Sequence, residues 1–405
     1  MTGVLFLCHR IPYPPNKGDK IRSYHILKKL AEQYSVFVGT FIDDPLDWNY
    51  VAKIQALATD SCILERTSLQ KMILPAISTL FSTKPLTNKL YFSLQMRLWV
   101  ENLIQSKSIS KIVVFSVSMA QYVLKFHTTI PIVTDFVDVD SEKWSAYSQY
   151  RRFPLNIFCK LEAKRLAAYE TLVAQHSSTN IFVSPQEVNL FKKLSPSVTK
   201  PIMCVSNGVD SQFFNPNLKY PNPYHGAKKR ILFTGLMNYW PNVDAVSWFV
   251  KYVFTILAQQ DKHIEFYIVG ANPTKAVFQL MRENIIVTGR VPDVRPYLKH
   301  ADVVVAPLRV AQGLQNKVLE AMSMNKSIVA SAQALEGIRV PKKGSIWVEI
   351  TSKNWINRIE NILYQIQDQP IDMHPWIVNH YSWENNLTSL SHILEGLNVQ
   401  SDSHA

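Results

Sequence analysis

The chain has 405 residues, of which 47% are hydrophobic and 18% charged, so it is long enough for two globular α/β domains and too apolar to be disordered. Its 43 Lys and Arg residues outnumber its 31 Asp and Glu residues, and the formal net charge of +12 predicts an anionic partner: nucleic acid, an acidic membrane surface or a phosphorylated ligand. Nucleic acid ranks last because the sequence has no long Lys/Arg run and no RNA-recognition signature.

The cysteines and the apolar segments indicate a cytoplasmic protein. None of Cys8, Cys62, Cys159 and Cys204 has CxxC or metal-ligand spacing, so we expect reduced core thiols. The sequence opens directly on a strand pattern at residues 4–9, so we expect no signal peptide. No run reaches the roughly 18–20 apolar residues of a membrane span.

Strand-like and helical patterns alternate along the first half of the chain. The predicted strands are residues 4–9, 35–41, 61–64, 111–117, 130–137, 180–184 and 202–205. Helical patterns fill most gaps, notably residues 20–33, 88–106 and 157–175. This alternation predicts βαβ units and a parallel sheet.

A linker with Pro, Asn and Gly at residues 219–229 precedes a second series of this kind. Its predicted strands are residues 230–234, 265–269, 285–288, 303–307, 328–330 and 346–348, and residues 381–397 form a further amphipathic helix. We therefore predict an α/β fold of two Rossmann-like domains whose parallel sheets face a central cleft. The predicted domains are residues 1–215 and 216–375, followed by a C-terminal helix in residues 376–405 that packs back toward the first domain.

Residues 302–324 form the most informative segment, a buried strand followed by a turn and an amphipathic helix. Arg309 follows the strand and Lys317 stands near the helix start, where the helix dipole favours anions. A basic helix N-terminus at the carboxyl end of a strand predicts a phosphate site, with an ordinary solvated βα unit as the alternative. No two of the 12 glycines have G-x-G spacing, so the dinucleotide fingerprint and the Walker A loop are absent.

The chain resembles the retaining GT-B glycosyltransferases of the family 4 type. The segments that carry this resemblance, in order, are residues 205–214, 231–249, 266–273, 287–308 and 316–322. Residues 9–31 and 135–148 are similar to the subgroup of sugar transferases associated with bacterial exopolysaccharide and exosortase (PEP-CTERM) loci. The resemblance implies a GT-B fold, a nucleotide-sugar donor bound by the second domain and an acceptor on the first.

The resemblance also implies roles for residues of the predicted phosphate site. The second Glu of the family's E-x7-E motif, which usually holds the donor ribose, is Glu320, whereas the first position is Gln312, which supplies no charge. Arg309 and Lys317 are the candidate pair for the diphosphate. Further donor contacts, largely through the backbone, are implied for Gly235, Arg290, Val291, Gly313, Leu314 and Gln315. A plain turn is the alternative for residues 289–293.

On the acceptor side, basic residues gather at the start of the helix predicted for residues 20–33. Gly18 resembles the family's N-terminal glycine loop, which approaches the donor diphosphate, and Asp19 is a plausible N-cap. Lys17, Lys20 and Arg22 cluster at the same positive helix end and are expected to meet an anion from across the cleft. A solvated basic helix start is the alternative.

Many relatives carry a His-Asp pair near the end of the fifth strand, where this chain has Asp135, Asp138 and Asp140 but no His. A carboxylate there can orient sugar or acceptor hydroxyls, or act as a base if burial raises its pKa. Asp138 is the first candidate, and His9 and Arg10 are secondary ones. A metal cluster is weighted low because GT-B enzymes generally need none, so we expect neither a metal nor a cofactor.

The implied reaction is retaining transfer, in which a positive cleft stabilises the leaving nucleoside diphosphate. We expect a lipid-linked or glycan acceptor, and peripheral binding of the protein to the cytoplasmic membrane through residues 70–81 and 89–100. Helices buried under a lid are the alternative for these two segments. Two other functions stay open: a nucleotide-sugar 2-epimerase, and an inactive GT-B binding subunit.

Overall fold

The computed structural model describes residues 2–15, 17–66, 84–106, 108–150, 152–311, 314–364 and 371–399. The chain divides into two compact units, and each is described by itself. The first unit comprises Met1–Ser206 and Leu387–Ala405, and the second comprises Asn207–Asn386.

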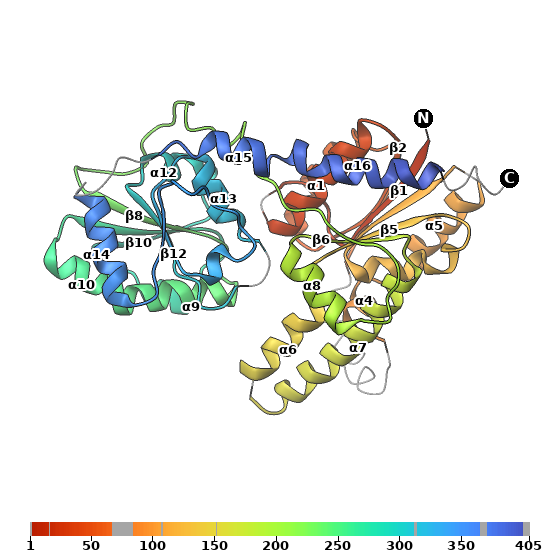
Figure 1. Ribbon diagram of the computed structural model, residues 1–405, viewed down its shortest axis with the longest axis horizontal. Helices are drawn as coiled ribbons and strands as arrows, with labels where there is room; N and C mark the ends of the chain where they lie inside the picture. Colours follow the sequence, from red (N-terminus) through yellow and green to blue (C-terminus); the bar gives the residue numbers. More distant parts are fainter. Residues whose placement is uncertain are drawn as a thin grey trace. The chain divides into compact units, whose positions relative to one another are not determined.

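A parallel seven-stranded sheet forms the centre of the first unit, with the strand order β3-β2-β1-β4-β5-β6-β7 (Figure 1). Its strands are β1 (Gly3–Cys8), β2 (Ser35–Ile42), β3 (Asp60–Glu65), β4 (Lys111–Phe115), β5 (Ile132–Val137), β6 (Thr179–Phe182) and β7 (Ile202–Cys204). Every residue of β1 and β4 is buried, as expected for central strands covered on both faces.

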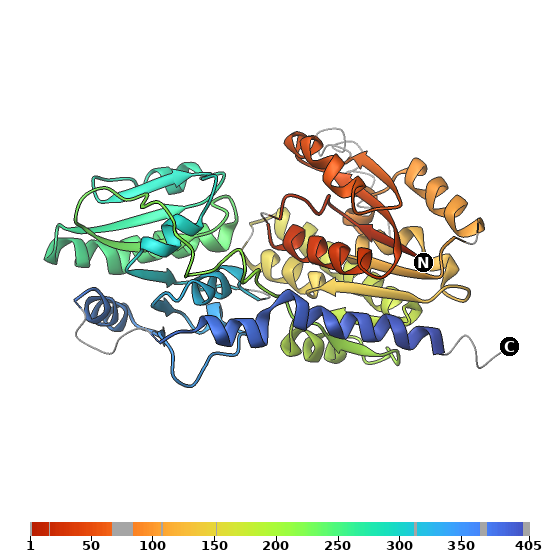
Figure 2. The ribbon, with the colours of Figure 1, turned by 90° about the horizontal axis from the view of Figure 1, so that it is seen from above.

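Helices connect these strands. They are α1 (Gly18–Ala31), α2 (Val51–Gln55), α4 (Leu86–Leu90), α5 (Leu94–Gln105), α6 (Asp140–Tyr150), α7 (Leu155–His176) and α8 (Pro185–Leu194), with 3-10 turns at η1 (Pro45–Tyr50), η3 (Val117–Tyr122) and η4 (Leu124–Phe126). Helix α16 (Trp383–Val399) begins in the second unit and continues along the first, as Figure 2 shows. There burial and the charge of Glu395 raise the pKa of Tyr34, which precedes β2.

The second unit is built on a parallel six-stranded sheet with the order β10-β9-β8-β11-β12-β13. Its strands are β8 (Lys229–Thr234), β9 (Ile264–Val269), β10 (Ile285–Gly289), β11 (Val303–Ala306), β12 (Ile328–Ala330) and β13 (Ile346–Val348). Its helices are α9 (Trp240–Phe249), η5 (Val250–Phe254), α10 (Thr255–Gln260), α11 (Lys275–Phe278), α12 (Arg295–His300), α13 (Asn316–Ser323), η6 (Gln333–Leu335), α14 (Ser352–Leu363) and α15 (His374–Tyr381). Helices α12 and α13 cover one face of this sheet, and α9, α10 and α14 cover the other (Figure 1).

The predicted strands are all confirmed, because short apolar runs separated by helical patterns mark them in the sequence. The single helix predicted for residues 88–106 is wrong: the chain breaks between α4 and α5, where the Ser93 side chain accepts a hydrogen bond from the Met96 backbone and starts a new helix. Cys204 is exposed in the short strand β7, so the prediction of core thiols is wrong for this residue. Among the described residues, no helix has both the length and the apolar character needed to cross a bilayer.

Candidate functional site

Three loops pack together at the carboxyl edge of the second sheet, after β8, β9 and β10. The backbone N–H of Gly235 donates to Val269 O at 3.0 Å, and that of Gly270 donates to Gly289 O at 3.2 Å. A Cβ added to Gly270 would lie 1.7 Å from the Gly235 carbonyl oxygen, so only glycine allows this approach. A Cβ on Gly235 would lie 3.0 Å from Lys317 Nζ. The first of these loops therefore lies directly beside the start of α13.

Lys317 stands in the first turn of α13, which carries no acidic residue. Its ammonium donates to Asn242 Oδ1 at 2.5 Å and lies 4.5 Å from the centre of the Phe233 ring. Burial lowers the pKa of Lys317 to about 7, and the charge of Glu320 offsets this only in part. A bound anion would favour the charged ammonium, so this helix start suits a phosphate.

Glu320 lies one turn further along α13 on the same helix face. Burial raises the pKa of its carboxyl to about 7, while Lys317 acts in the opposite direction. In the part of the chain that the structure describes, the Glu320 carboxylate makes no hydrogen bond or ion pair. It is therefore available to accept hydrogen bonds from a ligand such as a ribose.

Arg309 is placed differently from Lys317. Its guanidinium forms a two-pronged ion pair with Asp244 of α9, with Nε 2.9 Å from Oδ2, and 57% of the side chain is exposed. The first turns of α9 thus hold both predicted cations, since Asn242 contacts Lys317 and Asp244 contacts Arg309. Sequence reasoning missed these two α9 residues, although both lie in the segment 231–249 that carried the resemblance.

The other predicted donor residues lie in the turn after β10, at the start of α13, or outside the described residues. Arg290 is exposed, and Val291 packs partly against the core of the second unit. Leu314 is a buried core residue, and Gln315 occupies the N-cap of α13. Gln312 and Gly313 lie outside the described residues. The predicted backbone contacts to a donor remain predictions for all of them.

In the first unit, charged residues meet at the carboxyl ends of β1 and β2. The guanidinium of Arg10 bridges Asp19, at 2.8 Å, and Asp43, at 3.0 Å, while His9 Nε2 lies 3.4 Å from Asp19. Burial opposes ionisation of Asp19, yet His9 and Arg10 hold its pKa well below the usual range. Asp19 is not the N-cap predicted from the sequence: Lys17 occupies that position with extended backbone, and exposed Gly18 is the first helical residue.

Two predicted acceptor-side residues, Arg22 and Asp135, form one buried ion pair in which Nε and Oδ2 are 2.7 Å apart. Burial raises the pKa of Asp135, and Arg22 counteracts this. Lys20 is likewise buried against Asp47, at 2.5 Å. The charges of Lys20 and Arg22 are thus balanced by carboxylates of the same unit before any ligand binds.

Asp138 lies just beyond β5, after a turn in which Val137 has a positive φ of 69°. Lys143 donates to Asp138 Oδ2 at 2.8 Å and to Asp140 Oδ1 at 2.9 Å. Although burial disfavours its charge, these two carboxylates raise the pKa of Lys143. Asp138 Oδ1 is buried and has no hydrogen-bond partner among the described residues, so one oxygen of the candidate base is unpaired.

Two carboxylates that sequence reasoning missed bind the first turn of α6 and so fix this loop. Glu187 accepts from the Val139 backbone at 2.7 Å, and Glu170 accepts from the backbone and hydroxyl of Ser141 at 3.1 and 2.6 Å. Burial raises the pKa of Glu187 to about 7 and that of Glu170 to about 8. Within the described ranges, no group of His, Cys, Asp and Glu side chains is arranged to hold a metal ion.

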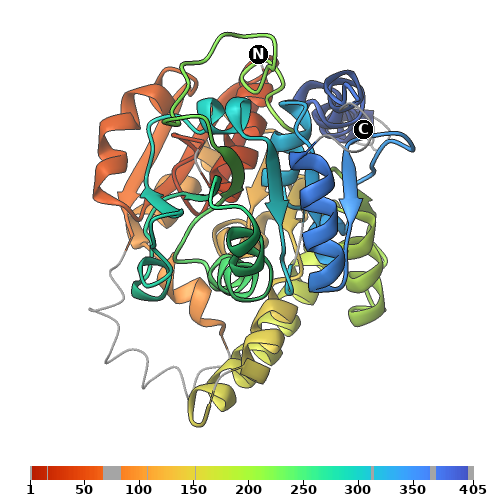
Figure 3. The same cartoon turned by 90° about the vertical axis from the view of Figure 1, so that its left-hand side faces the viewer.

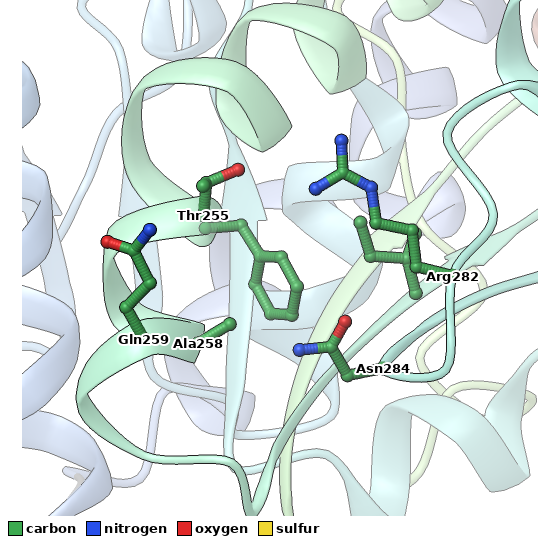
Figure 4. A pocket seen from close by; sticks show the side chains of 7 residues that line it. Thr255, Ala258, Gln259, Arg282 and Asn284 are labelled. Carbon is green, nitrogen blue, oxygen red and sulfur yellow. The ribbon is translucent and has the colours of Figure 1, made fainter.

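A small cavity of ≈ 200 Å³ lies at the opposite, amino edge of the second sheet (Figure 4). It is lined by Phe254, Thr255, Ala258, Gln259, Arg282, Asn284 and Ile285. Ile285 is the first residue of β10, whereas the loops beside Lys317 follow the last residues of the strands. The cavity is therefore separate from the candidate site.

Comparison with known proteins finds one family model and a set of solved structures that are similar to this chain. Residues 228–365 match the family described as Glycosyl transferases group 1, and no curated protein matches the chain. The chain is similar in structure to sucrose-phosphate synthase from Thermosynechococcus elongatus, with 14% identity, a TM-score of 0.69, and 99% of this chain and 100% of that chain covered.

Two further solved structures are similar over nearly their full length. A glycosyltransferase from Rickettsia africae has 13% identity, a TM-score of 0.64 and coverage of 97% of both chains. The Anabaena protein HepE in complex with UDP and glucose has 13% identity and a TM-score of 0.63, with 98% of this chain and 100% of that chain covered. At such identities the likeness establishes the fold: two α/β domains with parallel sheets of seven and six strands, the GT-B fold.

Proposed function

We propose that the protein is a retaining glycosyltransferase that moves a sugar from a nucleotide-sugar donor to a lipid-linked glycan acceptor in bacterial exopolysaccharide or other cell-surface polysaccharide synthesis. The observation that carries the proposal is the start of α13, where Lys317 and unpaired Glu320 lie in the part of the chain that matches Glycosyl transferases group 1. The retaining outcome, the family 4 type and the link to exosortase loci are the finer parts of the proposal and rest on the sequence resemblance.

In the proposed donor complex, the helix N-terminus and Lys317 bind the diphosphate, because a leaving nucleoside diphosphate gains negative charge in the transition state. Glu320 accepts hydrogen bonds from the ribose hydroxyls. The packed glycine loops lie beside the same helix start, and a donor phosphate oxygen takes the acceptor's proton, so no protein nucleophile, metal or cofactor takes part. The solved structures of HepE with UDP-glucose make a UDP-sugar the first donor to test.

On the acceptor side, we propose that Asp138 orients an acceptor or sugar hydroxyl with its unpaired oxygen, Oδ1. A lipid-linked acceptor requires access to the cytoplasmic face of the membrane. Of the two segments predicted to rest there, residues 70–81 lie outside the described residues, and residues 89–100 expose Phe92, Leu94 and Leu98. Peripheral membrane binding is thus part of the proposal.

The proposal is tested by ligand-observed NMR with UDP-, GDP-, ADP-, CMP- and TDP-sugars on the wild type, Glu320→Ala and the control Glu283→Ala. Glu283 is an exposed glutamate of the same unit and carries no ion pair among the described residues. We expect saturation transfer to one nucleotide, lost in Glu320→Ala and kept in Glu283→Ala. No transfer to any nucleotide in the wild type contradicts the donor site.

The activity of the protein is then measured with and without membrane extracts that contain lipid-linked glycans. Acceptor-dependent release of the nucleoside diphosphate supports transfer. Conversion of the donor sugar without an acceptor identifies a 2-epimerase instead, and donor binding without any turnover identifies an inactive binding subunit.

A further inference from the structure

Helices α6 and α7 form a hairpin that leaves the sheet of the first unit directly after the loop containing Asp138. The two helices pack along each other and project away from the strands, as Figure 1 and Figure 3 show. At the base of the hairpin, Glu170 of α7 binds Ser141 of α6. The far end, where α6 ends at Tyr150 and α7 begins at Leu155, points away from the sheet of the first unit (Figure 1).

This far end exposes large apolar side chains. Phe153 is 78% exposed and Leu155 is 56% exposed, and Ile157 and Leu161 follow at 48% and 39%. Ile157 and Leu161 are one helical turn apart and share one face of α7, while Phe153 and Leu155 lie next to them in the sequence at the bend. We call these four residues the hairpin tip. Four adjacent side chains of this kind form a patch, which single exposed hydrophobic residues do not.

Basic residues surround the hairpin tip. Arg152, Lys160 and Lys164 are exposed, and none of them forms an ion pair among the described residues. The sequence between Glu142 and Glu162 contains four Lys or Arg residues and no Asp or Glu. Because Lys160 and Lys164 also lie one turn apart, their charges flank the apolar stripe along α7.

We propose that the hairpin tip docks on an anionic lipid membrane surface. Apolar side chains entering the interface remove surface from water, while long basic side chains reach the lipid phosphates. Charge decides between this partner and a second copy of the chain, because two such tips would bring like charges together. The inference deepens the proposed function, since it supplies a membrane contact for the enzyme of a lipid-linked acceptor.

The position of the tip relative to Asp138 agrees with such an acceptor. Helix α6 has 11 residues and begins two residues after Asp138. At 1.5 Å per residue, the tip lies about 16 Å along the helix axis from Asp138. A tip seated among lipid headgroups therefore holds Asp138 close to the bilayer surface, where the head of a lipid-linked glycan projects.

The test is sedimentation of the full chain with vesicles, without donor or acceptor. Vesicles of phosphatidylcholine alone are compared with vesicles in which about a third of the lipid is phosphatidylglycerol. We expect binding only to the anionic vesicles. Two double variants are compared with the wild type: Phe153→Ser with Ile157→Ser, and Lys160→Gln with Lys164→Gln. Each is expected to lower the affinity about tenfold or more.

The control variant is Leu194→Ser. Leu194 is an exposed leucine at the end of α8, next to Lys192 and Lys193, so it reproduces the local chemistry of the tip. It lies at the base of the hairpin, because the neighbouring Ser195 contacts Thr171 of α7 at 2.8 Å. We expect Leu194→Ser to bind vesicles like the wild type, and circular dichroism to show that every variant is folded.

Three results overturn the proposal: a wild type that does not bind anionic vesicles, tip variants that bind them as well as the wild type, or a tip variant that only converts a dimer into a monomer. The last result assigns the tip to a second copy of the chain. Because vesicle binding and donor binding are measured separately, loss of the donor NMR signal with intact vesicle binding contradicts the proposed function alone.

Discussion

Two groups at the start of α13, the Lys317 ammonium and the Glu320 carboxyl, both titrate near neutral pH. Replacing Glu320 by Gln removes one of them and so shows what each contributes to donor binding. The pKa of Lys317 is lowered to about 7 and that of Glu320 is raised to about 7. A donor diphosphate binds best to the charged form of Lys317, and this form is lost as the pH rises through 7. Ionised Glu320 is the better acceptor of hydrogen bonds from the ribose hydroxyls. This ionised form is lost as the pH falls through 7. Donor affinity is therefore expected to peak near pH 7.

The shape of the pH dependence follows from the fractions of the two charged forms. The competent form, with Lys317 charged and Glu320 ionised, is most populated near pH 7 and becomes rarer on both sides, so affinity is expected to fall toward pH 5 and toward pH 9. In Glu320→Gln the acidic limb disappears, and affinity no longer falls toward pH 5. In Lys317→Met the alkaline limb disappears and affinity is lower throughout.

Isothermal titration calorimetry between pH 5 and 9 measures this profile, with the intact nucleotide-sugar that NMR selects. Its diphosphate carries no titrating proton in this range, so the phosphate groups contribute no slope of their own. The control Glu283→Ala should keep the wild-type profile. A wild-type affinity that varies less than about twofold across this range would refute the reasoning from the two pKa values.

Two further substitutions test the packing around the sites. Gly270→Ala places a Cβ 1.7 Å from the Gly235 carbonyl oxygen, so we expect the free energy of unfolding in urea to fall by about 2–4 kcal/mol and donor binding to be lost. The control Gly396→Ala is at a helical position with nothing within 4 Å of the new Cβ, so its stability should be unchanged or slightly higher. Arg22→Met leaves the Asp135 carboxylate buried without its partner, and we expect about 3–5 kcal/mol of destabilisation at pH 7 that shrinks at low pH as the carboxyl is protonated. Equal unfolding midpoints for Gly270→Ala and Gly396→Ala, or a pH-independent effect of Arg22→Met, would contradict these expectations.

The strands and the basic start of α13 could be predicted because their signals are local. A buried parallel strand such as β11 is a continuous apolar run, and Lys317 near a helix start without acidic residues is visible in a few letters of sequence. The break between α4 and α5 could not be predicted in this way. The helical periodicity continues across Ser93, and the turn there is fixed by a residue distant in sequence: the Tyr122 hydroxyl accepts from the Ser93 backbone at 2.8 Å.

Side-chain partners were the other part that the sequence did not reveal. Arg309 and Asp244 are 65 positions apart, and Glu170 is 29 positions from the Ser141 backbone that it binds. Such pairs depend on which helices the sheet order brings together, and local periodicity contains no information about that. The same limit explains why Arg22 and Asp135 were predicted as separate acceptor-side residues, although they form one ion pair across 113 positions.

The pairing of the basic residues also indicates where an anionic ligand is most needed. Lys20, Arg22 and Arg309 each have a carboxylate partner within their own unit, so their charges are already compensated. Lys317 instead faces a neutral amide and an aromatic ring, and burial makes its charge unfavourable near neutral pH. An anion at this helix start would stabilise the charged ammonium and satisfy the helix dipole together. A diphosphate would therefore bind with the most favourable electrostatic free energy at the start of α13. The buried ion pairs of the first unit instead fix the loops that would receive an uncharged acceptor hydroxyl.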